Sequence, residues 1–182
     1  MRACDMPISV TRRLRHQMLP GFDDIGHYWD SKHQLYAARI RPGEYYVTST
    51  NELISTVLGS CISACIRDPK CGIGGMNHFM LPHSATAGDG GYASTAARYG
   101  SYAMEHLINK ILAHGGERAR LETKLFGGGR MLRTITDVGS SNIAFVHDYL
   151  RTETLLVSAE DLGGIHPRKV LYFPETGRVL VR

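Results

Sequence analysis

The chain has 182 residues, 43% of them hydrophobic, and a formal net charge of +4 at pH 7. This length and apolar content favour one domain with one sizeable core, and no segment approaches the roughly 18 consecutive apolar residues of a membrane-spanning helix. The excess of basic over acidic residues is small. The densest group of basic residues, at 12–16, has too few aromatic residues among them for nucleic-acid binding. We therefore expect neither nucleic-acid binding nor membrane insertion.

The first 42 residues differ from the rest. They are polar, contain Pro20-Gly21 and Asp23-Asp24, and show no sustained period of 2 or 3.6. We therefore expect residues 1–42 to form a partly irregular extension, with a short helix around residues 14–19, packed on or trailing from a domain of residues 43–182. Because their early charges precede no continuous apolar stretch, we do not expect a signal peptide.

A strand is expected at residues 45–50, followed by a β-hairpin. Residues 62–67 alternate between apolar and mixed side chains, residues 68–71 have a turn sequence, and a second strand follows. Counting back from this turn sets Arg67 opposite Gly72 and Cys61 opposite His78. Directly opposed residues share a face, with Cβ atoms roughly 5 Å apart. A bulge at the glycine pair in the second strand would shift the register by one and move the histidine to the other face.

Helices and strands share the rest of the chain. In order, we expect a Gly/Ala/Ser loop at residues 84–92, a helix at 94–114, a strand at 121–126, a tight glycine turn at 127–129, a second helix capped by Asn142, and strands at 155–158, 169–173 and 178–182. The glycine turn lacks the lysine and serine of a phosphate-binding loop. Strands outnumber helices, which predicts an α+β fold with helices layered on sheet.

Cys61 and His78 are the candidate catalytic pair. A thiolate is a nucleophile, and a neighbouring imidazolium lowers the thiol pKa from its ordinary value of about 8.5. The spacing alone fits equally a buried, inert cysteine beside a hydrogen-bonded strand histidine, which is the commoner arrangement for free cysteines. Backbone N–H groups of Ser60 and Cys61 are the candidate donors to an oxyanion.

The cysteines also bear on metal binding and location. The chain has four, Cys4, Cys61, Cys65 and Cys71, and nothing indicates export, so we expect reduced thiols in a cytoplasmic protein. Three of them could be combined with His78 as zinc ligands. The predicted hairpin places Cys71 at its turn, roughly 20 Å along the strands from Cys61. Since that separation does not close one tetrahedron, we expect neither a metal nor a cofactor.

Several ordered blocks carry a family resemblance. They are STVLGSC at residues 55–61, GGMNHFMLP at 74–82, and further blocks at 124–131, 159–164 and 174–181. Together they resemble the CheD family, the chemoreceptor glutamine deamidases of bacterial chemotaxis. The resemblance implies that Cys61 is the nucleophile and His78 its base. The family's third residue, a threonine six positions before the cysteine, corresponds to Ser55, and Thr56 is the alternative.

The resemblance also implies a reaction, a fold and partners. The reaction is hydrolytic deamidation of glutamine to glutamate on the cytoplasmic helices of methyl-accepting chemotaxis receptors, through a thioester, in chemotaxis adaptation. The fold is a layered α/β sandwich with mixed sheets and two main helices, like the catalytic domains of deamidating necrotizing toxins. A CheC-type phosphatase is the second partner that the family implies. Two other classes stay open: a cysteine peptidase or transglutaminase with the same pair, and a non-catalytic adaptor that binds a phosphatase or receptor.

Overall fold

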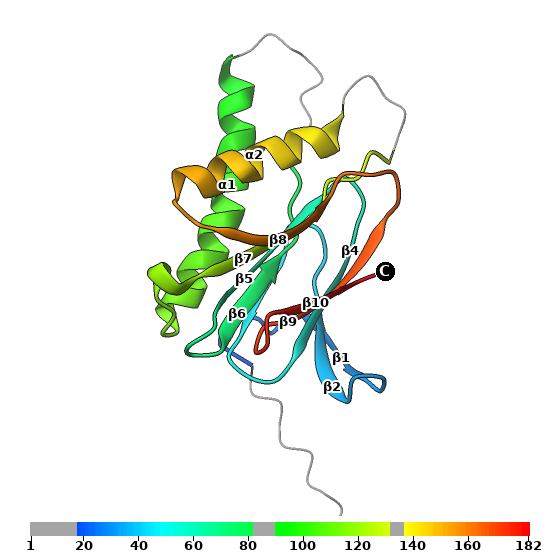
Figure 1. Ribbon diagram of the computed structural model, residues 1–182, viewed down its shortest axis with the longest axis vertical. Helices are drawn as coiled ribbons and strands as arrows, with labels where there is room; N and C mark the ends of the chain where they lie inside the picture. Colours follow the sequence, from blue (N-terminus) through cyan, green and yellow to red (C-terminus); the bar gives the residue numbers. More distant parts are fainter. Residues whose placement is uncertain (1–17, 82–89, 132–136) are drawn as a thin grey trace, which may run out of the picture.

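The structure, a computed structural model, describes residues 18–81, 90–131 and 137–182, and within residues 90–98 it describes the backbone alone (Figure 1). These parts form ten strands, two α-helices and one short 3-10 helix. In chain order they are β1 (Gly26–Asp30), β2 (Leu35–Arg39), β3 (Tyr45–Thr48), β4 (Leu53–Leu58), β5 (Ile62–Asp68), β6 (Ile73–Asn77), α1 (Gly90–Ala113), the 3-10 helix (Arg118–Arg120), β7 (Glu122–Gly127), α2 (Val138–Thr152), β8 (Val157–Leu162), β9 (Arg168–Phe173) and β10 (Arg178–Val181).

The strands build two mixed sheets of five. One sheet has the order β1-β2-β4-β9-β10 and the other β3-β6-β5-β7-β8. Each contains one parallel pair, β2 with β4 and β7 with β8, and the other neighbours are antiparallel. The predicted α+β class with mixed sheets and two main helices is therefore confirmed.

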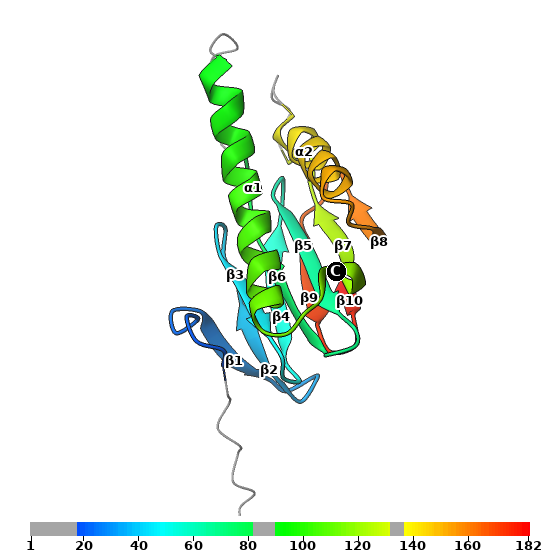
Figure 2. The ribbon, with the colours of Figure 1, turned by 90° about the vertical axis from the view of Figure 1, so that its left-hand side faces the viewer.

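The fold is layered: the two helices cover one sheet, and the second sheet packs against the other side of the first. Both helices lie on one side of the β3-β6-β5-β7-β8 sheet, and the β1-β2-β4-β9-β10 sheet lies on its other side (Figures 1 and 2). Two adjacent glycines of β6 show the same arrangement. A Cβ at Gly75 would lie 2.8 Å from Leu107 of α1, whereas a Cβ at Gly74 would lie 3.0 Å from Pro174, directly after β9. Side chains on both faces of the central sheet are therefore buried.

Two buried clusters hold these layers together. The larger lies between the sheets and beneath the helices, and it draws on side chains of both sheets, α1 and α2. The smaller lies on the outer face of the β1-β2-β4-β9-β10 sheet and consists of Ala37, Leu53 and Leu171, with Tyr28 and Phe173 packed against it. β4 therefore has a buried side chain on each face.

The stretch before residue 43, expected to be partly irregular, contains two strands that the sequence did not predict. β1 and β2 form an antiparallel hairpin, and β2 continues into the sheet by pairing in parallel with β4. Both strands are five residues long; the side chains of β1 are exposed or half-buried, and only β2 contributes buried ones. Strands this short leave no sustained alternation in the sequence. Most of the short helix expected at residues 14–19 lies outside the described residues, and the division at residue 42 stays a prediction.

The start of α2 also differs from the prediction. Its cap is Asp137, whose carboxylate accepts a hydrogen bond from the backbone N–H of Ser140. Asn142, which the sequence suggested as the cap, lies one turn inside the helix and is fully buried. Asparagine favours helix starts, but here the amide side chain forms hydrogen bonds with the segments around Cys61 and His78.

Candidate active site

The orientation of β4 decides which hydroxyl reaches His78. Side chains alternate across a strand, and in β4 Val57 is 61% exposed whereas Leu58 is buried in the core between the sheets. Ser55 shares the outward orientation of Val57. Thr56 points inward, toward the other sheet, and its side chain is buried.

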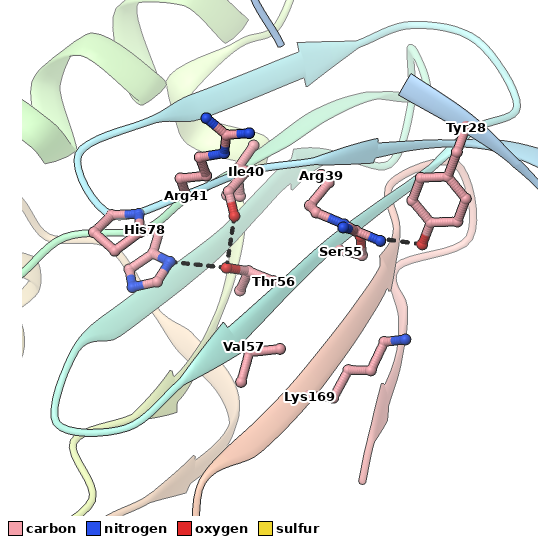
Figure 3. A pocket seen from close by; sticks show the side chains of 10 residues that line it. Tyr28, Arg39, Ile40, Arg41, Ser55, Thr56, Val57, His78 and Lys169 are labelled. Atoms are coloured by element: carbon pink, nitrogen blue, oxygen red, sulfur yellow. Dashed lines mark hydrogen bonds between the residues drawn. The ribbon is translucent and has the colours of Figure 1, made fainter. Parts of the chain in front are cut away.

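Thr56 orients the imidazole of His78. Thr56 Oγ1 lies 2.8 Å from His78 Nδ1 and 2.9 Å from the carbonyl oxygen of Ile40 (Figure 3). A hydroxyl has a single hydrogen, and Thr56 donates it to Ile40. It must therefore accept the second bond from His78 Nδ1–H, which leaves the lone pair of the neutral ring on Nε2.

His78 is also held through its backbone. Its N–H donates to the carbonyl of Glu44 at 2.9 Å, and its carbonyl accepts from the N–H of Gly43 at 2.7 Å. The side chain is buried, and no described group forms a hydrogen bond with Nε2. Burial lowers the pKa of His78 to about 4. The ring is consequently neutral near pH 7 and presents an unpaired base.

Cys61 lies in the turn between β4 and β5, and the backbone carbonyls of this turn all accept hydrogen bonds. The N–H groups of Gly129 and Gly128 donate to the carbonyls of Gly59 and Cys61, each at 2.8 Å. Asn142 Nδ2 donates to the carbonyl of Ser60 at 2.7 Å. All three carbonyls of the turn are therefore fixed by the glycine turn and by α2.

The predicted glycine turn at residues 127–129 begins within β7, whose last residue is Gly127. Gly127 has φ +110°, and a Cβ there would lie 2.1 Å from the carbonyl oxygen of Cys61. Glycine alone combines this backbone conformation with so close an approach. With the carbonyls of the cysteine turn engaged, no backbone carbonyl in the described parts of the chain accepts a hydrogen bond from the N–H groups of Ser60 and Cys61. The role of these two N–H groups as oxyanion donors stays a prediction.

Asn142 links the two halves of the site. Its Oδ1 accepts a hydrogen bond from the backbone N–H of Leu81 at 2.9 Å, while its Nδ2 holds the carbonyl of Ser60. The segment before Cys61 and the segment after His78 are thus joined by one buried amide. Sequence reasoning missed this role, since the only signal, a polar residue within an apolar helical stripe, resembled a helix cap.

The hairpin register differs from the prediction by two residues. Arg67 pairs with Gly74 and not with Gly72, because the turn includes Gly72, which has φ +71°. Farther along, Ile62 forms a bridge with Phe79. A shift of two residues, unlike a shift of one, keeps each side chain on its predicted face. His78 is therefore a diagonal neighbour of the cysteine turn instead of its direct partner.

The protonation states also differ from the expected thiolate–imidazolium pair. Burial raises the pKa of the Cys61 thiol, and hydrogen bonding to its own backbone N–H offsets this in part. Burial lowers the pKa of His78. Both shifts favour the neutral forms, so the free protein holds a thiol and a neutral imidazole. A base at Nε2 would have to take the thiol proton during the reaction.

Ser55 has other partners. Its hydroxyl donates to the carbonyl of Ala38 at 3.4 Å and accepts from the hydroxyl of Tyr28 at 3.3 Å. Because it points to the outer face of the sheet, it does not orient His78. The structure gives this contact to Thr56, the alternative that the sequence analysis retained.

A cavity of about 410 Å³ adjoins the Thr56–His78 pair (Figure 3). It reaches from the outer face of the β1-β2-β4-β9-β10 sheet, where it is bordered by Ser55 and Val57, to the imidazole. The opening lies where β2 ends. Ile40 N–H makes the last backbone bond to β4, at the carbonyl of Ser55, and the chain then departs at Arg41.

The other cysteines are separate from this site. Cys65 is buried in the core, and burial raises the pKa of its thiol. Cys71 is exposed at the hairpin turn, and Cys4 lies outside the described residues. Within residues 18–81, 90–131 and 137–182, no three His, Cys, Asp or Glu side chains gather as metal ligands. In the same parts, no helix is long and apolar enough to cross a membrane.

Comparison with known proteins decides the family. The model of a family described as CheD chemotactic sensory transduction matches residues 80–182. A relative from Halorhodospira halophila, named probable chemoreceptor glutamine deamidase CheD, is 59% identical over 165 residues, covering 88% of this chain and 76% of its own. The chain belongs to the CheD family. Relatives of the same name from Hahella chejuensis and Saccharophagus degradans are 51% and 50% identical, each covering 90% of this chain and 78% of their own.

The CheD resemblance read from the sequence is thereby confirmed. The matched region of the family model begins after His78 and holds the glycine turn and Asn142, the two elements that fix the carbonyls around Cys61. The relatives cover a larger share of the chain. The CheD assignment therefore does not depend on any single cysteine–histidine spacing.

Proposed function

We propose that this protein deamidates glutamine side chains of chemoreceptors, with Cys61 as nucleophile and His78 as base. Membership of the CheD family and the names of its relatives support the activity. The observation that carries the mechanism is the buried, unpaired Nε2 of His78, whose tautomer is set by Thr56 through Nδ1. A neutral base of this kind suits proton transfer from a thiol.

The first half of the reaction forms a thioester. His78 Nε2 takes the proton of the Cys61 thiol as Sγ attacks the carboxamide carbon, and the carbonyl oxygen becomes an oxyanion. Backbone N–H groups of Ser60 and Cys61 stabilise that charge. The imidazolium then protonates the amide nitrogen, the carbon–nitrogen bond breaks, and ammonia leaves.

The second half releases glutamate. His78 Nε2 takes a proton from a water molecule, which attacks the thioester carbon. The carbon–sulfur bond breaks, the thiolate recovers the proton from the imidazolium, and the side chain leaves as a carboxylic acid. One carboxamide and one water thus yield one carboxylic acid and one ammonia. Thr56 keeps Nδ1–H engaged throughout, so Nε2 carries the transferred proton in both halves.

The substrate and partners follow from the family. We infer that the substrates are methyl-accepting chemotaxis receptors, modified on their cytoplasmic helices, and that the new glutamates are available for methylation in adaptation. A CheC-type phosphatase is a further expected partner, and the site of action is cytoplasmic. The shared fold with deamidating necrotizing toxins also stays a prediction.

Incubation with the cytoplasmic fragment of a chemoreceptor separates these possibilities. Deamidation releases ammonia, leaves the polypeptide unbroken and raises its mass by the difference between a carboxamide and a carboxylic acid. A peptidase would cut the chain, and a transglutaminase would add a supplied primary amine. An adaptor would leave the fragment unchanged, and that result would overturn the proposed function.

A further inference from the structure

The cavity beside His78 has a cationic outer wall. In the sheet register, Arg39 of β2 pairs with Ser55, and Lys169 of β9 pairs with Val57. Directly opposed residues share a face, so Arg39 and Lys169 lie on the outward side of β4, one on each flank. Both line the cavity, and both are exposed.

These cations have no carboxylate partner in the described parts of the chain. The ion pairs found there use other residues, and no Asp or Glu lines the cavity. The guanidinium of Arg39 lies over the ring of Tyr28, 5.2 Å from its centroid. Arg41 also lines the cavity, but its backbone N–H binds the carboxylate of Glu44, which places a negative charge beside it.

The polar groups that line the cavity, and its volume, also suit a bound ligand. The hydroxyls of Tyr28 and Ser55 lie between the two cations on the same wall. The cavity volume, about 410 Å³, lies within the range of about 300–1,000 Å³ that is usual for ligand pockets. Since its inner end is Thr56 and His78, a group held here lies directly beside the catalytic base.

We propose that this cavity binds a carboxylate side chain of the substrate close to the glutamine that is deamidated, and that Arg39 and Lys169 are the residues that select it. The inference rests on the proposed deamidase activity. An unpaired cation pair beside the reacting group attracts an acidic neighbour of the target and disfavours a basic one, which gives specificity through charge complementarity.

The test uses a receptor fragment and a matched pair of enzyme variants. The glutamine converted by the wild-type enzyme is first located by peptide mass spectrometry, and each Asp or Glu within one helical turn of it is then replaced by alanine. The enzyme variant is Arg39→Gln/Lys169→Gln. Its control is Lys32→Gln/Lys70→Gln, which removes the same charge from two exposed positions outside the cavity.

Loss of the two cations should raise KM by about fivefold to tenfold, as expected for two partly exposed charge pairs, with kcat within about twofold of wild type. The control should match wild type. One acidic replacement in the fragment should raise the wild-type KM comparably and have no further effect on the variant. If wild type converts the glutamine and the variant has an unchanged KM, the carboxylate site is wrong and the deamidase activity stands. If wild type converts no glutamine, both proposals fail.

Discussion

The hydroxyl of Thr56 lies 2.8 Å from Nδ1 of His78 and donates its own hydrogen to the carbonyl of Ile40. This chain of two hydrogen bonds selects the imidazole tautomer whose lone pair is on Nε2. It also couples the two sheets, because Thr56 belongs to β4 and His78 follows β6. The imidazole is therefore oriented from the opposite layer of the fold.

Removal of the Thr56 hydroxyl should impair turnover. We expect Thr56→Val, which keeps the shape of the side chain, to lower kcat by about 10- to 100-fold through misorientation of the base. Thr56→Ser should retain most of the activity, and Ser55→Ala should lower kcat less than Thr56→Val. The measurement is steady-state deamidation of a receptor fragment.

A control for Thr56→Val is available in β7. Thr123 is also fully buried, and its hydroxyl has no described partner. Thr123→Val should leave kcat unchanged and raise the free energy of unfolding by about 1 kcal/mol, since it removes an unsatisfied buried hydroxyl. A larger loss of kcat for Ser55→Ala than for Thr56→Val would contradict the orienting role of Thr56.

Acid should destabilise the fold through His78. Burial lowers its pKa to about 4, below the ordinary value of about 6.5, so the unfolded chain takes up the proton first as pH falls. The stability linked to the neutral ring is present above about pH 6.5 and is lost as pH falls toward about 4. We expect a loss of up to roughly 3 kcal/mol over this interval.

Comparison with His78→Gln isolates that effect. Other titrating groups, including Asp68, whose pKa is lowered by hydrogen bonds from Arg120, are present in both proteins and cancel in the difference. Denaturant unfolding of both proteins across the interval should show a steeper loss for wild type. Parallel curves would mean that His78 titrates near its ordinary value.

The Cys61 thiol should react slowly with iodoacetamide in the free protein. Burial raises its pKa, so alkylation should rise only above the ordinary thiol value of about 8.5. Cys71 should be alkylated faster than Cys61 because it is exposed, and mass spectrometry of the two peptides distinguishes them. Rapid alkylation of Cys61 at about pH 6, abolished by His78→Gln, would instead establish a thiolate–imidazolium pair.

The glycine turn should tolerate no side chain at Gly127. A Cβ there would lie 2.1 Å from the carbonyl oxygen of Cys61, so Gly127→Ala should cost roughly 3 kcal/mol or more of stability, with loss of activity. Gly163 also has a positive φ, but no atom lies within 4 Å of its added Cβ. Gly163→Ala should therefore cost only about 1 kcal/mol, and equal losses in thermal or denaturant unfolding would contradict the steric account.

Local patterns in the sequence predicted much of this fold. The alternation of β5 and β6, the apolar stripe of α1 and the glycine turn each reflect short-range preferences, and the structure contains all of them. β1 and β2 escaped prediction because they are short, and β1 lies at the edge of its sheet. β2 is held in the sheet by pairing with β4, and β1 by pairing with β2. No local pattern in the sequence reports the pairing with β4.

The residues of the candidate site were likewise predictable from the sequence only in part. Cys61 and His78 could be proposed from the sequence, because their motifs are specific. The choice between Ser55 and Thr56 depends on which face of β4 meets the other sheet, and the role of Asn142 depends on how α2 packs. Both are tertiary relationships between segments far apart in the chain, so spacing could not decide them.

The most direct test of the Cys61–His78 mechanism is the intact mass of a chemoreceptor cytoplasmic fragment after incubation with four proteins: wild type, Cys61→Ala, His78→Gln and Cys71→Ala. Wild type and Cys71→Ala should convert the same glutamines to glutamate at similar rates, because Cys71 is exposed at a distant turn. Cys61→Ala and His78→Gln should convert none, while retaining the fold by circular dichroism. Conversion by Cys61→Ala at the wild-type rate would contradict the assignment of the nucleophile and with it the mechanism.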